Sequence, residues 1–281
     1  MNNLFNTAGL HPHIAAMVES HPLFSKLPTS LLGTANTKTV KGEKIGVLTG
    51  ILYLSPADSI SPKLNICPYA DIAGCKVGCL NTAGRGAFNS VQRARIRKTL
   101  MWAQYHDEFM ALLIRDIERL RRKAKRENMT LAIRLNGTSD IQWELQYGAS
   151  FSWKNVERKL LPVHQQNCNI FEIFPTVQFY DYTKIPRRNV PANYHLTFSY
   201  SGVAAFQPVV LKQLQHAPHT NLAVVYRGKL PWWDQILGSR RVVINGDASD
   251  VRYQDPAGVI VGLTAKGKAK NDTSGFVVAG A

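Results

Sequence analysis

The chain alternates short apolar runs with longer segments, and this alternation restricts the folds open to it more than any other feature. The runs are TLAIRLNG (130–137), TVQFYDYTK (176–184), YHLTFSYSG (194–202), NLAVVYRGK (221–229), RVVINGD (241–247) and GVIVGL (258–263). Each run is typical of a buried strand, and the gaps at 156–165 and 207–215 can hold helices. Strands that alternate with helices predict a mainly parallel sheet.

The N-terminal half supplies the remaining elements. Residues 1–37 predict a short extension with a helix near 11–19, and residues 38–281 a single α/β domain. Apolar runs broken by glycines predict a hairpin over 38–54, with 45–54 as the first sheet strand. Apolar residues at three- and four-residue steps predict one long helix over 89–127. We expect an open or partial (β/α) barrel of mainly parallel strands, with a doubly wound sheet as the alternative.

Three of the four cysteines lie in the stretch NICPYADIAGCKVGCLNTAGRG (65–86), at a spacing of C-x7-C-x3-C. The N-terminus lacks a basic start followed by an apolar core, so we expect a cytoplasmic protein, in which clustered thiols bind metal or react. Cys67, Cys75 and Cys79 are therefore predicted to bind a 4Fe–4S cluster with one open iron. Zinc and no metal at all are the alternatives, and Cys168 is a candidate fourth ligand.

Polar side chains follow most of the predicted strands. The carboxyl ends of parallel strands meet at one edge of a sheet, where ligands bind, so these side chains predict a small-molecule site. The candidates for acid–base chemistry are Asp140, Tyr180 and Asp181. The candidates for holding a cofactor or substrate by hydrogen bonds and charge are Asn136, Ser139, Ser199, Arg227 and Lys229.

The chain is strongly basic. Lys and Arg number 34 and Asp and Glu 19, which gives a net charge of +15 and favours nucleic acid or a phosphorylated ligand as a partner. The run RLRRKAKR (119–126) ends the long predicted helix and is either a nucleic-acid surface or a solvated helix end. Trp232, Trp233 and Tyr253 lie beside basic residues, where bases stack; the alternative for the Trp pair is a packing anchor. No apolar run approaches the ~20 residues that cross a bilayer.

Five segments together resemble the bacteriophage "gene product 88" family over roughly residues 45–265: CPYADIAGCKVGCLNTAGRG, VQRARIRKT, IRLNGTSDIQWE, FPTVQFYDYTK and NYHLTFSYSG. The resemblance implies a phage or prophage protein of the bacterial host cytoplasm. It also implies that the cysteine loop, the RLNGTSD segment and the FYDYTK segment share one site.

The cysteine loop after the first strand also resembles the radical S-adenosylmethionine enzymes, whose usual spacing is C-x3-C-x2-C. The strand GVIVG (258–262) is similar to their adenine-contacting G-x-I-x-G strand.

Three functions follow, and whether the chain is an enzyme stays open. The first is a redox or radical enzyme with a 4Fe–4S cluster and S-adenosylmethionine, acting on a small or nucleotide-like substrate. The second is a basic nucleic-acid-binding phage protein with a structural metal. The third is a virion or assembly component. The hydrolase and phosphate-loop motifs G-x-S-x-G, H-E-x-x-H and G-x-x-x-x-G-K-[ST] do not occur in the sequence.

Overall fold

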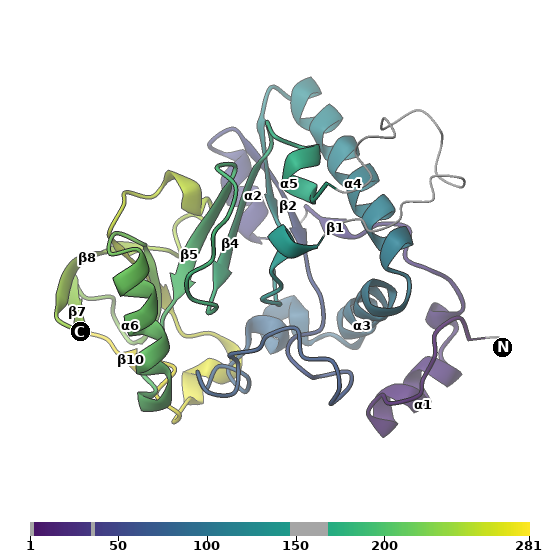
Figure 1. Cartoon of the computed structure of the whole chain (residues 1–281), viewed down its shortest axis with the longest axis horizontal. Helices are drawn as coiled ribbons and strands as arrows, with labels where there is room; N and C mark the ends of the chain where they lie inside the picture. Colours follow the sequence, from purple (N-terminus) through teal and green to yellow (C-terminus); the bar gives the residue numbers. More distant parts are fainter. Residues whose placement is uncertain (1–2, 35–36, 147–167) are drawn as a thin grey trace.

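The computed structural model describes residues 3–34, 37–146 and 168–281 (Figure 1). Their strands form one ten-stranded sheet in the order β1-β2-β3-β4-β5-β6-β9-β8-β7, with β10 beside β6. The pairs β1–β2 and β7–β8 are antiparallel, and the other pairs are parallel. The predicted α/β class with mainly parallel strands is confirmed. The sheet is not closed, so the barrel itself is not confirmed.

The bounds of the elements agree closely with the apolar runs. The strands are β1 (Leu32–Gly33), β2 (Val47–Leu52), β3 (Thr130–Arg134), β4 (Gln178–Thr183), β5 (Tyr194–Ser199), β6 (Leu222–Arg227), β7 (Trp233–Ile236), β8 (Ser239–Asn245), β9 (Ile260–Thr264) and β10 (Val278–Ala279). The helices are α1 (Pro12–Ser20), α2 (Thr37–Glu43), α3 (Asn89–Gln104), α4 (His106–Arg126), α5 (Ile170–Ile173) and α6 (Gln207–His216). None of the described helices is long and apolar enough to cross a membrane.

The main helices cover one face of the sheet. The buried side of α4 shares a hydrophobic cluster with Leu48 of β2 and Ile133 of β3. The buried side of α6 shares a second cluster with Phe198 and Val224. The strand register puts these apolar residues on the same face. The parallel strands from β2 to β6 lie in chain order without the reversal that a doubly wound sheet has, so the topology does not support that alternative.

The opposite face is covered by α2 at β2 and by the chain that follows β8 over the middle strands. The Tyr253 ring lies 5.8 Å from the Tyr180 ring of β4. Asp250 forms a buried ion pair with Arg134 of β3, with 3.2 Å between Oδ2 and Nη1. This segment, which includes a short 3-10 helix at Arg252–Gln254, therefore fills the inner face over the middle strands and leaves the region near their carboxyl ends open.

Two predicted elements differ from the structure. Residues 37–43 form α2 rather than the first arm of a hairpin, because β2 finds its antiparallel partner in β1. The predicted helix over 89–127 is two helices that meet at Tyr105, whose hydroxyl donates to the Leu4 carbonyl and whose ring packs on Phe5. The helix predicted over 156–165 lies outside the described residues.

The predicted N-terminal extension packs onto the main body of the protein. Phe5, Ile14, Val18 and Phe24 are buried in the same cluster as α4. The extension also supplies β1 to the sheet.

Candidate functional site

A cavity of about 230 Å³ opens at the carboxyl ends of β3, β4, β5, β6 and β9. Its walls come from three parts of the chain: the strand ends, the cysteine loop and the C-terminal segment 266–276. The volume is a little below the ~300–1,000 Å³ of pockets that bury whole drug-sized ligands. The cavity therefore suits a compact group, and a larger ligand must extend beyond the mouth.

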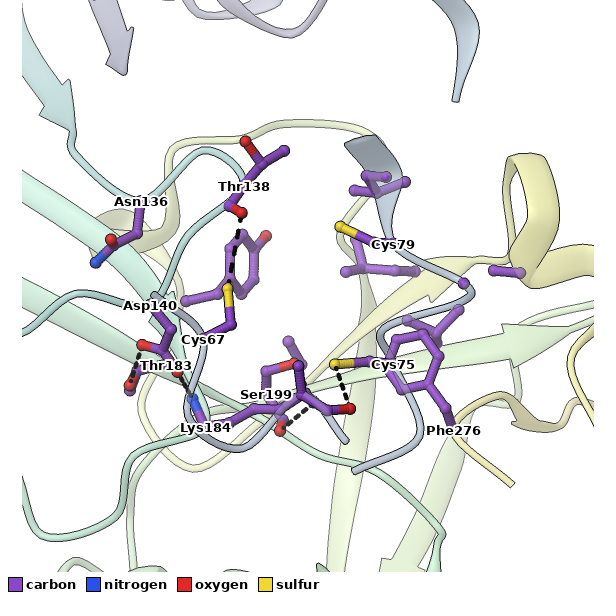
Figure 2. Close-up of a pocket in the computed structure, with 18 of the residues that line it drawn as sticks. Cys67, Cys75, Cys79, Asn136, Thr138, Asp140, Thr183, Lys184, Ser199 and Phe276 are labelled. Carbon is purple, nitrogen blue, oxygen red and sulfur yellow. Dashed lines mark hydrogen bonds between the residues drawn. The ribbon is translucent and has the colours of Figure 1, made fainter. Parts of the chain in front are cut away.

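All three loop cysteines line this cavity. Figure 2 shows Cys67 on one side of the central space, with Cys75 and Cys79 on the other and their sulfur atoms turned toward it. Cys168 directly precedes α5 and does not line the cavity. The structure thus brings together the three thiols that the sequence spacing singled out, without the fourth.

Hydrogen bonds hold each thiol in place. The Cys67 Sγ accepts from the Ala57 amide at 3.3 Å and lies 3.8 Å from the Thr138 carbonyl, so it bridges the chain after β2 and the turn after β3. The Cys75 Sγ lies 3.7 Å from the Ala70 carbonyl. The Cys79 Sγ accepts from the backbone amide two residues on, at 3.5 Å. These contacts are long and weak, as is usual for sulfur, and they fix direction more than they add stability.

The cysteine loop also packs tightly against the C-terminal segment. Gly74 has φ +66°, and a Cβ atom there would lie 2.4 Å from the Ser274 Oγ. Only glycine combines this left-handed backbone with this close approach. The loop is further anchored at its outer side by Lys76, whose ammonium is 2.8 Å from an oxygen of Asp58.

Burial raises the pKa of all three thiols. It is the largest cause for Cys67, Cys75 and Cys79, and the Cys67 pKa is raised further by negative charge on Asp140, Cys79 and Cys75. This mutual effect means that the thiols are near enough to interact. Without a positive ligand among them they stay protonated, and a bound metal would have to displace their protons.

A buried lysine, Lys184, also lines the cavity. The Lys184 ammonium donates to the Ser199 carbonyl at 2.9 Å and to the Ser199 Oγ at 3.0 Å. It also lies 5.3 Å and 5.1 Å from the centres of the Phe206 and Phe276 rings. Burial lowers its pKa, while negative charge on Cys75, Asp140 and Cys67 opposes that shift. A positive Lys184 would therefore stabilise thiolates in the cavity.

The RLNGTSD segment forms a rigid turn in the cavity wall. The Asn136 Oδ1 accepts hydrogen bonds from the Ser139 hydroxyl, the Ile141 amide and the Trp143 indole. Asp140 accepts from the Thr183 hydroxyl at 2.8 Å and from the Lys184 amide at 2.7 Å, and burial raises its pKa. Asn136 and Ser139 therefore bond to each other and shape the wall, while Asp140 ties this turn to the end of β4.

Four of the predicted site residues lie away from the cavity. Asp181 lies on the helix-covered face of β4, where its carboxylate accepts from the Asn136 amide and the Tyr194 hydroxyl, both at 2.8 Å. Burial raises its pKa to about 7. Tyr180 is buried against Asp250 on the inner face. Arg227 and Lys229 are exposed and lie outside the cavity wall. The structure does not bring these four to the thiols.

The GVIVG strand has a packing role in this structure. A Cβ atom on Gly262 would lie 2.7 Å from the Val243 Cγ1 and 3.1 Å from the Leu230 Cδ2. Side chains of this chain already occupy the space that an adenine ring would need at Gly262. Leu263, the next residue, faces the opposite side of the sheet and lines the cavity.

The cavity wall contains residues that the sequence did not point to. Lys266, Ala269 and Phe276 come from the C-terminal segment, which follows β9. This segment has no regular apolar period, so no pattern linked it to the cysteine loop. Its only local signal is the cluster of glycine, lysine and polar residues, which is typical of any surface loop.

Within residues 3–34, 37–146 and 168–281, no three or more His, Cys, Asp and Glu side chains are arranged to hold a metal ion. A cubane cluster places its own iron and sulfide atoms between the thiolates, and it therefore accepts thiols that stand further apart.

Comparisons with known proteins address the family. No curated protein and no solved structure matches the chain. The family model described as Gene product 88 matches residues 29–280, which is most of the chain. The match includes the cysteine loop, the RLNGTSD turn and the FYDYTK strand that together surround the cavity. The chain therefore belongs to the Gene product 88 family of bacteriophage proteins.

Proposed function

We propose that this protein binds a 4Fe–4S cluster through Cys67, Cys75 and Cys79, and that the cluster keeps one open iron for a small ligand. The observation that carries the proposal is that the three thiols of one loop line one cavity at the carboxyl ends of parallel strands. Catalytic and cofactor sites of parallel α/β proteins occur at this edge. The family membership supports the phage origin of the protein and says nothing about a metal.

The residues around the thiols suit thiolate ligation. Lys184 and Arg95 are the cations whose charge favours the thiolate forms of Cys75 and Cys79. Cys168 does not line the cavity, and among the described residues the proposed cluster therefore has the three loop cysteines as its ligands. Three cysteine ligands on a four-iron cluster leave one iron without a protein ligand, which is the arrangement that permits chemistry as well as electron transfer.

The rest of the wall would then contact the small ligand. Asp140 holds a proton more readily than an exposed carboxyl group because burial raises its pKa. The Ser199 hydroxyl and the Tyr182 ring also face the cavity. A buried carboxyl group, a hydroxyl group and an ammonium group around a compact space can orient a polar ligand and exchange a proton with it. These groups suit a redox or radical enzyme better than a purely structural metal site.

S-adenosylmethionine fits the site less well than the cluster does. Arg227 and Lys229, the expected partners of its carboxylate or of a phosphate, lie outside the cavity. Gly262, the expected adenine contact, is packed against Val243 and Leu230. The residues at these positions therefore do not fit S-adenosylmethionine.

The test is the iron and sulfide content and the visible absorption of protein purified without oxygen. We expect about four iron and four sulfide per chain, with visible absorption that the apoprotein lacks. Serine at any one of Cys67, Cys75 or Cys79 should remove most of the iron. The matched control is Cys168→Ser, which should keep it.

Three results would contradict the proposal. Stoichiometric zinc without iron would replace the cluster by a structural metal. Equal iron loss in Cys168→Ser would mean a closed, four-cysteine site. The third result is a wild-type protein that takes up no iron during anaerobic reconstitution while its circular dichroism shows that it is folded. That result would show that the site binds no cluster.

A further inference from the structure

The hairpin of β7 and β8 exposes large apolar side chains at the edge of the sheet. Trp232 is 90% exposed and Trp233 50%, and Val242 and Leu237 are 62% and 47% exposed. Isolated exposed apolar residues are ordinary on a protein surface, whereas two adjacent indoles on one hairpin are not. Figure 1 shows this hairpin at the opposite side of the molecule from α1, α3 and α4.

The hairpin is held rigidly, so the exposure of the indoles belongs to the fold. Trp233 pairs with Val242, and the Val243 amide donates to the Trp232 carbonyl at 3.0 Å. On its other face, Ile236 is buried, and the Arg241 guanidinium donates to the carbonyls of Pro218 and Thr220. The inner face of the hairpin, with Ile236 and Arg241, therefore anchors it to the protein body, and the outer face, with Trp233 and Val242, is exposed to solvent.

The outer face of the hairpin carries positive charge next to the indoles. The Arg240 guanidinium lies over the Trp233 ring, 4.0 Å from its centre. Between positions 227 and 245 the sequence has four basic residues and one acidic residue, Asp234; Arg241 is buried on the inner side, and Arg227, Lys229 and Arg240 are exposed. The Asp234 carboxylate already accepts from the Tyr226 hydroxyl and the Gln235 amide, both at 2.7 Å. The surface thus combines stacking platforms with a local excess of cations.

We infer that this hairpin binds single-stranded nucleic acid, with bases stacked on Trp232 and on the Arg240–Trp233 pair and phosphates near Arg240 and Lys229. Exposed aromatic rings beside basic side chains bind single strands with little sequence preference, because every base offers a flat face. The net charge of +15 adds general attraction for a polyanion.

A second copy of this chain is a less suitable occupant. A symmetric contact through this face would bring each Arg240 toward the same cations of the other copy. A neutral or basic protein partner meets the same repulsion. The excess of cations therefore favours nucleic acid over a second copy of the chain as the partner of this surface.

The experiment is fluorescence anisotropy with labelled dT and rU oligonucleotides of about 16 nucleotides, at several salt concentrations. We expect Trp232→Ala to weaken binding by at least about fivefold and to leave the dependence on salt unchanged, because stacking involves no ion release. Arg240→Gln should reduce the slope of log K against log salt by about 0.7, the value for one phosphate contact on a single strand. Trp232→Phe should restore most of the affinity.

Two controls separate the hairpin from other surfaces. Phe88→Ala removes an exposed aromatic ring outside the hairpin and should leave binding unchanged. Charge reversal at Arg122 and Arg126, at the exposed end of α4, tests the other basic surface. Each variant is checked for folding by circular dichroism, and iron content is not a readout, so the result is independent of the cluster proposal.

The inference would be overturned by unchanged affinity in the folded Trp232→Ala and Trp233→Ala variants. It would also be overturned if binding is lost only on charge reversal of α4. Loss of a dimer in sedimentation on Trp232→Ala, without any oligonucleotide binding by the wild type, would assign the hairpin to contact between copies of the chain.

Discussion

At the scale of single residues, the candidate site depends on how a buried ammonium group affects buried thiols. Burial raises the pKa of Cys67, Cys75 and Cys79, so these thiols hold their protons more tightly than exposed thiols do. Iron uptake must release those protons and should therefore fall as the pH is lowered. Because Lys184 opposes the rise in the Cys75 pKa, Lys184→Met should move iron uptake to higher pH. Iron bound per chain after anaerobic reconstitution between about pH 6 and pH 9 measures the shift.

Lys266→Met is the matched control for that prediction. Lys266 also lines the cavity, but its ammonium is paired with Asp247 and is about half exposed, so its field at the thiols is screened. An equal shift from both variants would mean that general charge loss, and not the position of Lys184, sets the uptake. If Lys184→Met causes no shift, Lys184 does not help the thiols to bind metal.

Several of the predicted site residues line the cavity, and the reason is physical. Cys67, Cys75, Cys79, Asp140 and Ser199 all reach the cavity because they follow or end parallel strands, whose carboxyl ends share one edge. Strand-end position alone does not reveal which face a side chain takes. Asp181 and Tyr182 are neighbours on β4, yet only Tyr182 faces the cavity. A parallel strand that is buried on both faces has no polar side to distinguish them.

At the scale of elements, the turn over 136–141 determines the shape of the cavity wall. The Gly137 amide donates to the Leu52 carbonyl at 2.9 Å, and the Thr138 hydroxyl donates to the Leu54 carbonyl at 2.5 Å. The turn after β3 is thus joined to the chain that leads from β2 to the cysteine loop. A Cβ atom on Gly137 would lie 2.5 Å from the Leu52 carbonyl oxygen.

Gly137→Ala should therefore separate these two segments. We expect it to destabilise the protein by about 1–3 kcal/mol, the usual cost of overpacking, and to reduce iron uptake because Thr138 also contacts Cys67. Urea unfolding measures the first effect and iron content the second. Gly228→Ala is the control: no atom lies within 4 Å of a Cβ there, so it tests a glycine with φ +86° that has no tight contact. Full iron uptake in folded Gly137→Ala would show that the turn does not position the cysteine loop.

The sheet strands after residue 130 were more predictable than the elements before them. Continuous apolar spacing runs from α3 into α4, so the break at Tyr105 leaves no mark in the periodicity. The contact that produces the break is made with residues about a hundred positions away, at Leu4 and Phe5. In the same way, α2 replaces a hairpin arm because β1 occupies the edge of β2. Both the break at Tyr105 and the formation of α2 depend on contacts between distant residues, which a local sequence pattern does not show.

At the scale of the whole molecule, the open sheet is covered on its inner face by the short segment 250–253, which packs beside α2, and not by closure into a barrel. Arg134 lies at the centre of this contact. Its Nη1 is 3.2 Å from Asp250, its Nε is 3.8 Å from Asp181, and its guanidinium lies 4.7 Å from the centre of the Tyr182 ring. The side chains of Arg134 and Asp250 are 7% and 4% exposed. The segment has no apolar period, so its place in the interior was not predictable from the sequence.

The Arg134–Asp250 pair gives the last prediction. Asp250→Ala leaves a buried guanidinium with less compensation and should lower the free energy of unfolding by about 3–5 kcal/mol. Adding Arg134→Met removes that uncompensated charge, so the double variant should be more stable than the sum of the single effects predicts, by about 1 kcal/mol or more. Urea unfolding of the four proteins in this cycle measures the coupling. Lys76→Ala breaks the exposed pair with Asp58 and should cost only about 0–1 kcal/mol, because water already screens it. Additive effects of the two buried substitutions would mean that Arg134 and Asp250 do not stabilise each other, and that apolar contacts such as those of Val251 hold the segment in the interior instead.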